Sequence, residues 1–377
     1  MRVAVVHSFY RSGQPSGENA IVLEQVEALK RAGHEVELIA KSSDVEFSQT
    51  WSSVRAGINV AFGTGFDPTH LLRNFEPEIV HVHNTFPNVS LKWLAPFRDR
   101  LVVTLHNYRT VCANGLLFRD GRVCLECVRN SSIAGLKHGC YRDSRTATLP
   151  LTIRNYGGAR NHPVIAEART VVCLSQGALD LFQSLGVSPD KLKLVPNGID
   201  DPMTDQFETA NNRWIFAGRL SSEKGIGELV EMWPENERLD VFGGGPLLAD
   251  LQQHERADIR LMGAIERDEL LKVLPRYSGL IFPSSCLEMQ PTIILEALAA
   301  GVPIVARINN AGSEIVDGNN CGAVFNSSEE LKSSLTFIRQ QGRDLRQRCR
   351  EVFQEKYSRQ AWLSRQVALY YEILRGS

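Results

Sequence analysis

Apolar residues along the chain fall into short runs rich in valine and isoleucine, and these alternate with segments of helical spacing. In the first half, the runs lie at residues 3–7, 35–40, 79–84, 101–107 and 170–175. Nearly continuous apolar runs are typical of strands in a parallel sheet that is covered on both faces. Between the first two runs, residues 18–32 have apolar side chains at helical spacing, and Gly33 follows as a typical helix-ending glycine.

The same alternation returns after a polar, turn-rich segment at residues 195–213. Further strands are predicted at residues 214–220, 239–245, 259–263, 279–284, 303–307 and 322–326. Two successive β-α-β series predict an α/β protein with two doubly wound, Rossmann-like domains. We place these domains at residues 1–197, with a cysteine-rich insert at 109–145, and at residues 198–358. Residues 359–377 are predicted to form a last helix that can pack back on the N-terminal domain.

Charge and hydropathy narrow the range of partners. Lys and Arg number 42 and Asp and Glu number 43, so the formal net charge is −1 and gives no sign of a nucleic-acid partner. The first apolar run is too short for a signal peptide, and no run of about 18 apolar residues would span a bilayer. We expect a cytoplasmic protein whose contact with a membrane, if any, is peripheral and at its inner face.

Candidate chemistry follows the predicted strands, because ligands of open parallel sheets bind at the carboxyl ends of the strands. The first strand leads through a loop with Gly17 into a helix. After a later strand, Gly218 precedes Arg219 and Lys224, whose side chains can converge on one anion. The next loop contains three glycines ending at Gly245, and Pro246 is predicted to occupy the first position of a helix.

The segment SSCLEMQPTIILEALAAGVPIVA contains two glutamates, Glu288 and Glu296, eight positions apart. Pro291 suits the first position of a helix, whose unpaired N–H groups favour a phosphate. Glu296 would lie about five residues along that helix, roughly 7–8 Å from its start. The two carboxylates would then bracket a phosphate and accept hydrogen bonds from hydroxyls, as a nucleoside-diphosphate sugar requires. The alternative is a capping carboxylate with a buried ion pair.

The segments GRLSSEKG, VFGGGP, FPSSCLEMQPTIILEALAAGVPIVA and VPNGID resemble the GT-B glycosyltransferases, specifically the retaining family 4 type (glycosyl transferases group 1). The resemblance covers nearly the whole chain. It implies two Rossmann-like domains that face a central cleft. It also implies that Arg219 and Lys224 hold the donor diphosphate, that Glu296 binds the ribose and that Glu288 contacts the sugar. No catalytic metal is implied.

Further donor contacts follow from the same resemblance. Backbone groups of Pro291, Thr292 and Ile293 would meet the phosphate, His106 would face the donor sugar, and Gly17 matches the glycine of the N-terminal loop. That loop reads PSGENA instead of the usual Gly-Gly-x-Glu, which leaves the role of Glu18 open.

Acceptor contacts are expected at His83, Asn84 and Arg109. Five arginines interleave with apolar residues in this part of the chain, which is typical either of a lipid or polyprenyl-diphosphate site or of a solvated face with packed stems. They are Arg109, Arg142, Arg145, Arg154 and Arg160.

The insert contains four cysteines with the spacing C-x11-C-x2-C-x12-C, which fits a structural zinc site. His138 is an alternative ligand. Two disulfides, an iron–sulfur cluster or four free thiols are the competing interpretations. The cysteines are Cys112, Cys124, Cys127 and Cys140.

Together these observations predict a retaining hexosyltransferase. It would move a sugar from a nucleotide-sugar donor to a glycan or lipid-linked acceptor, in the synthesis of cell-surface polysaccharide or lipopolysaccharide. A nucleotide-sugar epimerase or hydrolase on the same scaffold and a non-catalytic nucleotide-sugar binding subunit are the alternatives.

Overall fold

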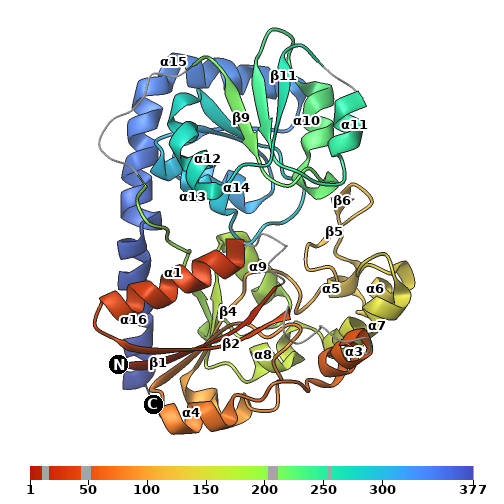
Figure 1. Ribbon diagram of the computed structural model, residues 1–377, viewed down its shortest axis with the longest axis vertical. Coiled ribbons are helices and arrows are strands. Elements are labelled where there is room, and N and C mark those ends of the chain that lie inside the picture. The colour runs from red at the N-terminus through yellow and green to blue at the C-terminus, as the bar shows by residue number, and fades with distance from the viewer. Residues whose placement is uncertain (11–16, 44–51, 203–210, 254–255, 377) are drawn as a thin grey trace. The chain divides into compact units, whose positions relative to one another are not determined.

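The computed structural model describes residues 1–10, 17–43, 52–202, 211–253 and 256–376 (Figure 1). Its contacts divide the chain into two compact units. Unit 1 comprises Met1–Leu117, Cys124–Asn197 and Trp362–Ser377, and unit 2 comprises Phe118–Val123 and Gly198–Ala361. Each unit is built around a six-stranded parallel sheet, so the predicted α/β class with two doubly wound sheets is confirmed.

The sheet of unit 1 has the strand order β2-β1-β3-β4-β7-β8. Its strands are β1 (Arg2–Phe9), β2 (Glu35–Ser42), β3 (Ile79–Asn84), β4 (Leu101–Thr104), β7 (Thr170–Cys173) and β8 (Leu192–Leu194). The order reverses between β1 and β3, so the carboxyl ends of these two strands border a crevice. Polar side chains at the ends of β1, β3 and β4 therefore gather in one place.

Helices surround this sheet. They are α1 (Gly17–Arg31), α3 (Ser52–Phe62), α4 (Thr69–Phe75), α5 (Glu126–Arg129), α6 (Ile133–His138), α7 (Arg145–Asn155), α8 (Pro163–Ala166), α9 (Gln176–Ser184) and α16 (Arg359–Arg375). The last helix packs on unit 1, where Trp362 and Tyr370 join Val3, Val26 and Ile79 in one buried cluster. Each large apolar side chain buried in this way stabilises the unit by about 1.5–3 kcal/mol.

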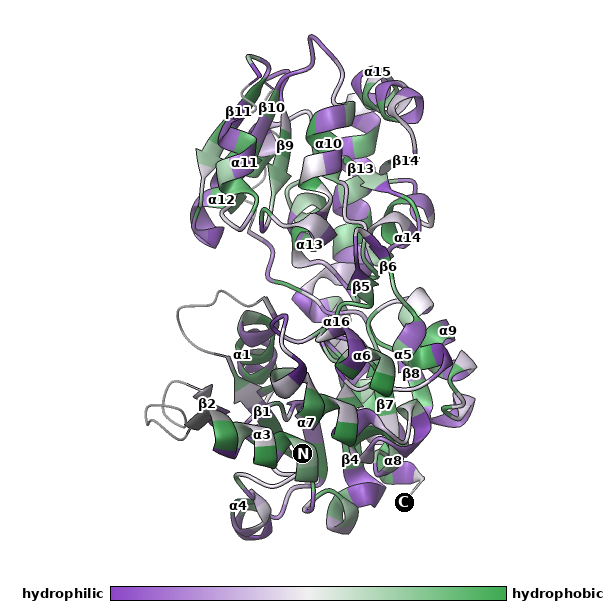
Figure 2. Cartoon of the chain, turned by 90° about the vertical axis from the view of Figure 1, so that its right-hand side faces the viewer, coloured by the Kyte–Doolittle hydropathy of each residue, from purple (hydrophilic) through white to green (hydrophobic). Residues whose placement is uncertain are grey.

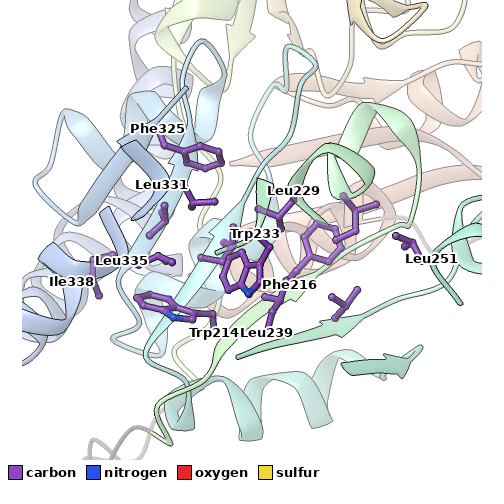
Figure 3. Close-up of a cluster of buried hydrophobic side chains, with 14 of the residues drawn as sticks. Trp214, Phe216, Leu229, Trp233, Leu239, Leu251, Phe325, Leu331, Leu335 and Ile338 are labelled. Atoms are coloured by element: carbon purple, nitrogen blue, oxygen red, sulfur yellow. The ribbon is translucent and has the colours of Figure 1, made fainter. Parts of the chain in front are cut away.

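The sheet of unit 2 has the order β11-β10-β9-β12-β13-β14, and its order reverses between β9 and β12. Its strands are β9 (Trp214–Ala217), β10 (Leu239–Phe242), β11 (Ile259–Gly263), β12 (Gly279–Phe282), β13 (Ile304–Arg307) and β14 (Gly322–Phe325). Its helices are α10 (Ile226–Met232), α11 (Leu248–Gln253), α12 (Arg267–Val273), α13 (Thr292–Ala299), α14 (Ala311–Asp317) and α15 (Ser328–Val352). Trp214, Trp233 and Leu335 belong to the apolar cluster that fixes this sheet against its helices (Figure 3).

Some predicted boundaries were wrong. The helix expected to begin at Pro246 begins at Leu248, because the residues before it bond to the preceding loop: Leu247 donates its backbone N–H to the Leu220 carbonyl at 3.0 Å. A short hairpin, β5 (Phe118–Arg119) and β6 (Arg122–Val123), was not predicted. Its turn contains Asp120 and Gly121, both with positive φ, and this Asp-Gly pair was the available signal.

Candidate functional site

Two loops of unit 2 meet at its switch point, one after β9 and one after β12. The first contains a single 3-10 turn, Ser222–Lys224, and ends at Gly225. The backbone N–H of Ser285 donates to the carbonyl of Glu223 at 2.9 Å, and Ser284 Oγ lies 3.2 Å from the same carbonyl oxygen. These bonds join the loop that contains Lys224 to the loop that contains Glu288.

Lys224 and Glu288 form an ion pair at this junction. The Lys224 ammonium lies 2.6 Å from Glu288 Oε1, which also accepts a hydrogen bond from the Ser284 hydroxyl at 2.8 Å. Burial alone would lower the pKa of Lys224, but the Glu288 carboxylate raises it above its usual value, helped by smaller contributions from Cys286 and Glu223. Lys224 therefore stays charged, and two of its three N–H donors remain for another acceptor.

Arg219 and Gly218 lie exposed at the start of the same loop. The structure thus places the two predicted cations, Arg219 and Lys224, on one short loop at the carboxyl end of β9. It also pairs Lys224 with a predicted sugar-contacting carboxylate, which sequence spacing did not indicate.

Helix α13 begins beside this pair. Pro291 is its N-cap, with φ −74° and ψ 122°, and not its first helical residue as predicted. Thr292 and Ile293 are the first two helical residues, and N–H groups at such a start have no partner within the helix. Glu296 is the fifth residue, only 4% exposed, and accepts a hydrogen bond from Arg267 Nε at 2.7 Å. Arg267 itself was not among the predicted site residues.

The glycines after β10 have a packing role. At Gly243, a Cβ would overlap the carbonyl oxygen of Gly218, and at Gly245 it would overlap Leu220. The Leu220 N–H also donates to the Gly244 carbonyl at 3.0 Å. These residues let the loops after β9 and β10 approach closely, which positions Gly218 and Arg219.

Replacing Gly225 with alanine should lower the free energy of unfolding by about 2 kcal/mol or more. Gly225 has φ +70°, and a Cβ there would overlap the Pro283 carbonyl oxygen. Gly263→Ala is the matched control, because Gly263 has φ +79° but open space around its Cβ position. Denaturant unfolding of both variants separates overlap from backbone strain. Equal losses of stability would show that the junction with Pro283 is not tight.

Four histidines gather in unit 1 at the ends of β1, β3 and β4. His83 Nδ1 and His106 Nε2 are 2.9 Å apart, and the rings of His81 and His83 have centroids 4.1 Å apart. Burial lowers the pKa of His7 to about 4, and the pKa of His81 and of His106 to about 3. Burial and the neighbouring histidines likewise hold the pKa of His83 well below its usual value. All four rings are therefore neutral near pH 7.

Around this cluster lies a network of polar groups at the start of α1, the helix that begins at Gly17. Asn107 donates to Glu18 Oε2 at 3.2 Å, and Asn84 donates to the Tyr10 hydroxyl at 3.0 Å. Burial raises the pKa of Glu18 to about 7, against the opposing effects of Arg109 and of hydrogen bonds from Asn107 and Asn84. The predicted residues Asn84 and Arg109 thus belong to the same network as Glu18, whose role the sequence left open.

A pocket opens beside these histidines, within unit 1. Among the residues that line it are His83, Asn84, His106 and Arg109, which were all predicted site residues. Arg154 and His162 line it as well. Arg154 had been noted only as one of five interleaved arginines, and no sequence pattern singled out His162.

The predicted zinc site is not supported. No three His, Cys, Asp or Glu side chains among the described residues, which include all four cysteines and His138, form a group that could hold a metal. The Cys112 thiol donates to Asn114 Oδ1 at 2.9 Å, and His138 lies 3.2 Å from Glu126. Burial, together with the nearby Cys112, Cys140 and Cys124, raises the pKa of Cys127 to about 12, so the four thiols lie close enough to influence one another. The spacing brings the thiols near one another without arranging them as ligands.

Within the described ranges, no helix is both long enough and apolar enough to cross a bilayer.

Comparison with known proteins places these features in a family. Residues 15–201 match Glycosyltransferase Family 4, and residues 211–339 match glycosyl transferases group 1. The chain is 28% identical over 173 residues to alpha-monoglucosyldiacylglycerol synthase of Acholeplasma laidlawii, covering 42% of this chain and 43% of that one. It is 30% identical over 139 residues to an exopolysaccharide phosphotransferase of Streptomyces coelicolor, covering 33% and 14%. The chain therefore matches less than half the length of these curated relatives.

Solved structures are similar over the whole chain. Sucrose-phosphate synthase of Thermosynechococcus elongatus has a TM-score of 0.66 at 14% identity, with 100% of both chains covered. HepE of Anabaena, solved with UDP, has a TM-score of 0.58 at 14% identity, covering 99% of this chain and 100% of that one. At this identity the likeness shows the fold alone, which is that of the GT-B glycosyltransferases.

Proposed function

The chain belongs to the family 4 glycosyltransferases of the group 1 type and has the GT-B fold, and from this premise we propose that it transfers a hexose-type sugar from a nucleoside-diphosphate sugar. The acceptor is a glycan or a lipid-linked molecule in the synthesis of cell-surface polysaccharide or lipopolysaccharide. The transfer retains the configuration at the anomeric carbon and uses no catalytic metal.

The observation that supports this most is the arrangement at the switch point of unit 2. Lys224, Arg219 and the N-terminus of α13 present positive charge and N–H donors at the carboxyl ends of β9 and β12. Glu288 and Glu296 stand on either side of that helix start and repel a phosphate, but they can accept hydrogen bonds from hydroxyls. This pattern suits a diphosphate with a hydroxyl-bearing group at each end, which is a nucleotide sugar.

In the proposed reaction, the bond between the sugar and the diphosphate breaks and negative charge grows on the leaving nucleotide. Lys224 and Arg219, with the backbone N–H groups of Thr292 and Ile293, stabilise that charge. Lys224 is already ordered by Glu288 at 2.6 Å, so little reorganisation is needed when the charge develops. Glu296 holds the ribose, and Glu288 orients the sugar. The acceptor attacks on the face that the nucleotide leaves, so no protein nucleophile is required.

His106 is proposed to contact the donor sugar as a neutral imidazole. Its Nε2 lies 2.9 Å from His83 Nδ1, so one of these two nitrogens is protonated and donates a hydrogen bond to the other. His83 therefore sets the tautomer of His106 and with it the hydrogen-bonding character of His106 Nδ1. Asn84 and Arg109 are proposed to bind the acceptor.

A thermal-shift panel of UDP-, GDP-, ADP- and dTDP-sugars tests donor binding. A ligand at 100 times its Kd stabilises the folded form by about 2.7 kcal/mol, so the cognate donor should raise the midpoint of unfolding by several degrees. No shift with any nucleotide sugar would contradict the proposal.

The two alternative functions differ in products. An epimerase or hydrolase would convert the donor without a sugar acceptor. A binding subunit would show a raised midpoint of unfolding in the panel but would not consume the donor. We expect nucleotide release to depend on an added acceptor. A search for that acceptor can begin with diacylglycerol and polyprenyl-diphosphate sugars, because the Acholeplasma relative is named a glucosyldiacylglycerol synthase.

A lipid acceptor also agrees with an exposed apolar face on unit 1. Val54, Ile58 and Phe62 follow one another at four-residue intervals on α3 and are 55%, 52% and 66% exposed. Helix α7 packs on α3 where Gly57 meets Pro150, and both helices contain hydrophobic stretches (Figure 2). Leu149 and Ile153 of α7 are exposed as well. Arg55 and Arg145 are exposed on the same two helices. Apolar residues with basic neighbours suit the surface of an anionic membrane.

Replacing Ile58 and Phe62 with aspartate should reduce binding to phosphatidylglycerol vesicles at least tenfold in a sedimentation assay, because two apolar contacts are lost and two negative charges are added. Phe337→Asp is the matched control, since Phe337 is also exposed but lies on α15 of unit 2. Vesicle binding that is equal for the double variant and the control would contradict membrane contact through α3.

A further inference from the structure

The pocket of unit 1 contains two guanidinium groups. Arg109 and Arg154 both line it, and each places its Nε in a buried position without a hydrogen-bond partner among the described residues. His162 lines the same pocket, is 3% exposed, and has a buried Nδ1 that is likewise without a partner there. Buried polar atoms in folded proteins are almost always hydrogen-bonded, so three such atoms around one pocket call for an explanation.

The charges in the pocket are also unbalanced. Burial and the positive charge of Arg109 lower the pKa of Arg154 to about 10, so Arg154 is still protonated near pH 7. The described residues that line the pocket include no aspartate or glutamate. The acid that offsets Arg109 is Glu18, which bonds to Asn107 and whose pKa of about 7 leaves it only partly ionised at neutral pH. Arg109 and Arg154 therefore repel each other, because the negative charge of Glu18 offsets less than one of their two positive charges. A bound anion would relieve this repulsion.

Each guanidinium is held by contacts with neighbouring residues. Arg154 Nη2 donates to the Thr85 hydroxyl at 3.2 Å, and Arg109 Nη1 donates to the Ala113 carbonyl at 3.1 Å. The Arg109 guanidinium also lies 4.5 Å from the centre of the Phe86 ring. Because each guanidinium is anchored at one end, its remaining N–H groups keep a fixed direction, as a preorganised anion site requires.

We propose that this pocket binds a phosphate-type oxyanion through Arg154, Arg109 and His162, and that the anion belongs to the acceptor substrate. The second half of the proposal rests on the proposed glycosyl transfer, whereas the anion site itself does not. A tetrahedral phosphate offers more oxygens than a carboxylate to two guanidinium groups and an imidazole. The pocket lies beside His83 and His106, which also line it, so a phosphate held there would place the acceptor next to the proposed sugar-contacting histidine.

Isothermal titration of the full chain with inorganic pyrophosphate and phosphate tests the site, with the nucleoside diphosphate of the donor found in the thermal-shift panel present at saturation so that the proposed donor site is filled. We expect binding to the wild type, at least tenfold weaker binding to Arg154→Gln, and binding within twofold of wild type for Arg160→Gln. Arg160 is an exposed arginine that does not line the pocket. Its variant therefore removes one positive charge, as Arg154→Gln does, without changing the pocket. Arg154→Lys keeps the positive charge but lacks the planar guanidinium with its several N–H donors. This variant should also bind pyrophosphate weakly, and it replaces Arg154→Gln if that variant fails to fold.

The outcomes separate the two proposals. Pyrophosphate binding that is seen only without nucleotide, survives Arg154→Gln and Arg154→Lys and disappears in Arg219→Ala/Lys224→Ala would overturn the anion site while supporting the donor site. Binding that depends on Arg154 in a protein that binds none of the nucleotide sugars of the thermal-shift panel would support the anion site and contradict the proposed function. Acetate binding as tightly as phosphate would overturn the assignment to phosphate.

A further titration with dihexanoylphosphatidylglycerol below its micelle concentration identifies the source of the anion. Tighter binding of this lipid than of phosphate, lost in Arg154→Gln, supports a lipid headgroup. Weaker binding of the lipid, with phosphate binding still dependent on Arg154, supports a soluble phosphorylated acceptor.

Discussion

Lys224→Met should lower kcat by about 10²- to 10³-fold, the loss typical when one preorganised donor to a developing negative charge is removed. Lys224 is the predicted phosphate-binding cation that the structure pairs with a predicted site carboxylate, Glu288 at 2.6 Å. Methionine keeps much of the length of the side chain but provides no charge. Steady-state kinetics with a fixed acceptor and varied nucleotide sugar measures the effect.

The control for this variant is Lys272→Met. Lys272 is also paired with a glutamate, Glu269 at 2.6 Å, but the pair is exposed on α12. We expect its kcat to stay within twofold of the wild type. We expect Lys224→Met to fold, because Glu288 keeps the hydrogen bond from Ser284. Thermal unfolding of both variants checks this. A Lys224→Met enzyme that is folded and retains full kcat would remove Lys224 from the reaction.

Glu296→Gln should raise KM for the donor by about 10- to 100-fold, with a smaller change in kcat. A hydrogen bond to a charged group contributes about 1.5–3 kcal/mol, and the proposed ribose contact is the same in the ground state and the transition state. Loss of such uniform binding appears in KM. Glutamine keeps the shape of the side chain, and Arg267, whose side chain is 37% exposed, can be solvated when its partner is neutral.

Glu237→Gln is the matched control. Glu237 is a partly buried glutamate of unit 2 that accepts a hydrogen bond from Trp214 Nε1 at 2.9 Å and pairs with Arg339, away from the loops after β9 and β12. Its KM for the donor should be unchanged. If both variants raised KM equally, the effect would reflect a loss of charge in unit 2 and not ribose binding by Glu296.

The strands could be predicted because parallel strands covered on both faces must be almost wholly apolar. The run at residues 79–84 coincides with β3, where five of the six residues are buried. The run at 259–263 coincides with β11, an edge strand that is more exposed but still has apolar residues at three of its five positions. The run at residues 101–107 overshoots β4, which ends at Thr104, because strand pairing stops there although the apolar pattern continues to Leu105. β8 was missed because three residues, Leu192–Leu194, give too short a pattern to recognise.

The candidate site could be predicted only as a set of residue types on particular loops. Lys224 and Glu288 are 64 positions apart, so their pairing depends on how the loops after β9 and β12 meet and not on any local pattern. The same holds for Arg267, which reaches Glu296 from 29 positions away. The cysteine spacing could not decide on a zinc site for the complementary reason: spacing limits how far apart thiols can be, but it does not determine which way they point.

The most direct test of the account is a crystal structure of the protein with its cognate nucleotide sugar or with UDP. The account predicts that the diphosphate lies within hydrogen-bond distance of Lys224, Arg219 and the first N–H groups of α13, with the ribose on Glu296. A nucleotide bound with its phosphates away from the loops after β9 and β12 would contradict it.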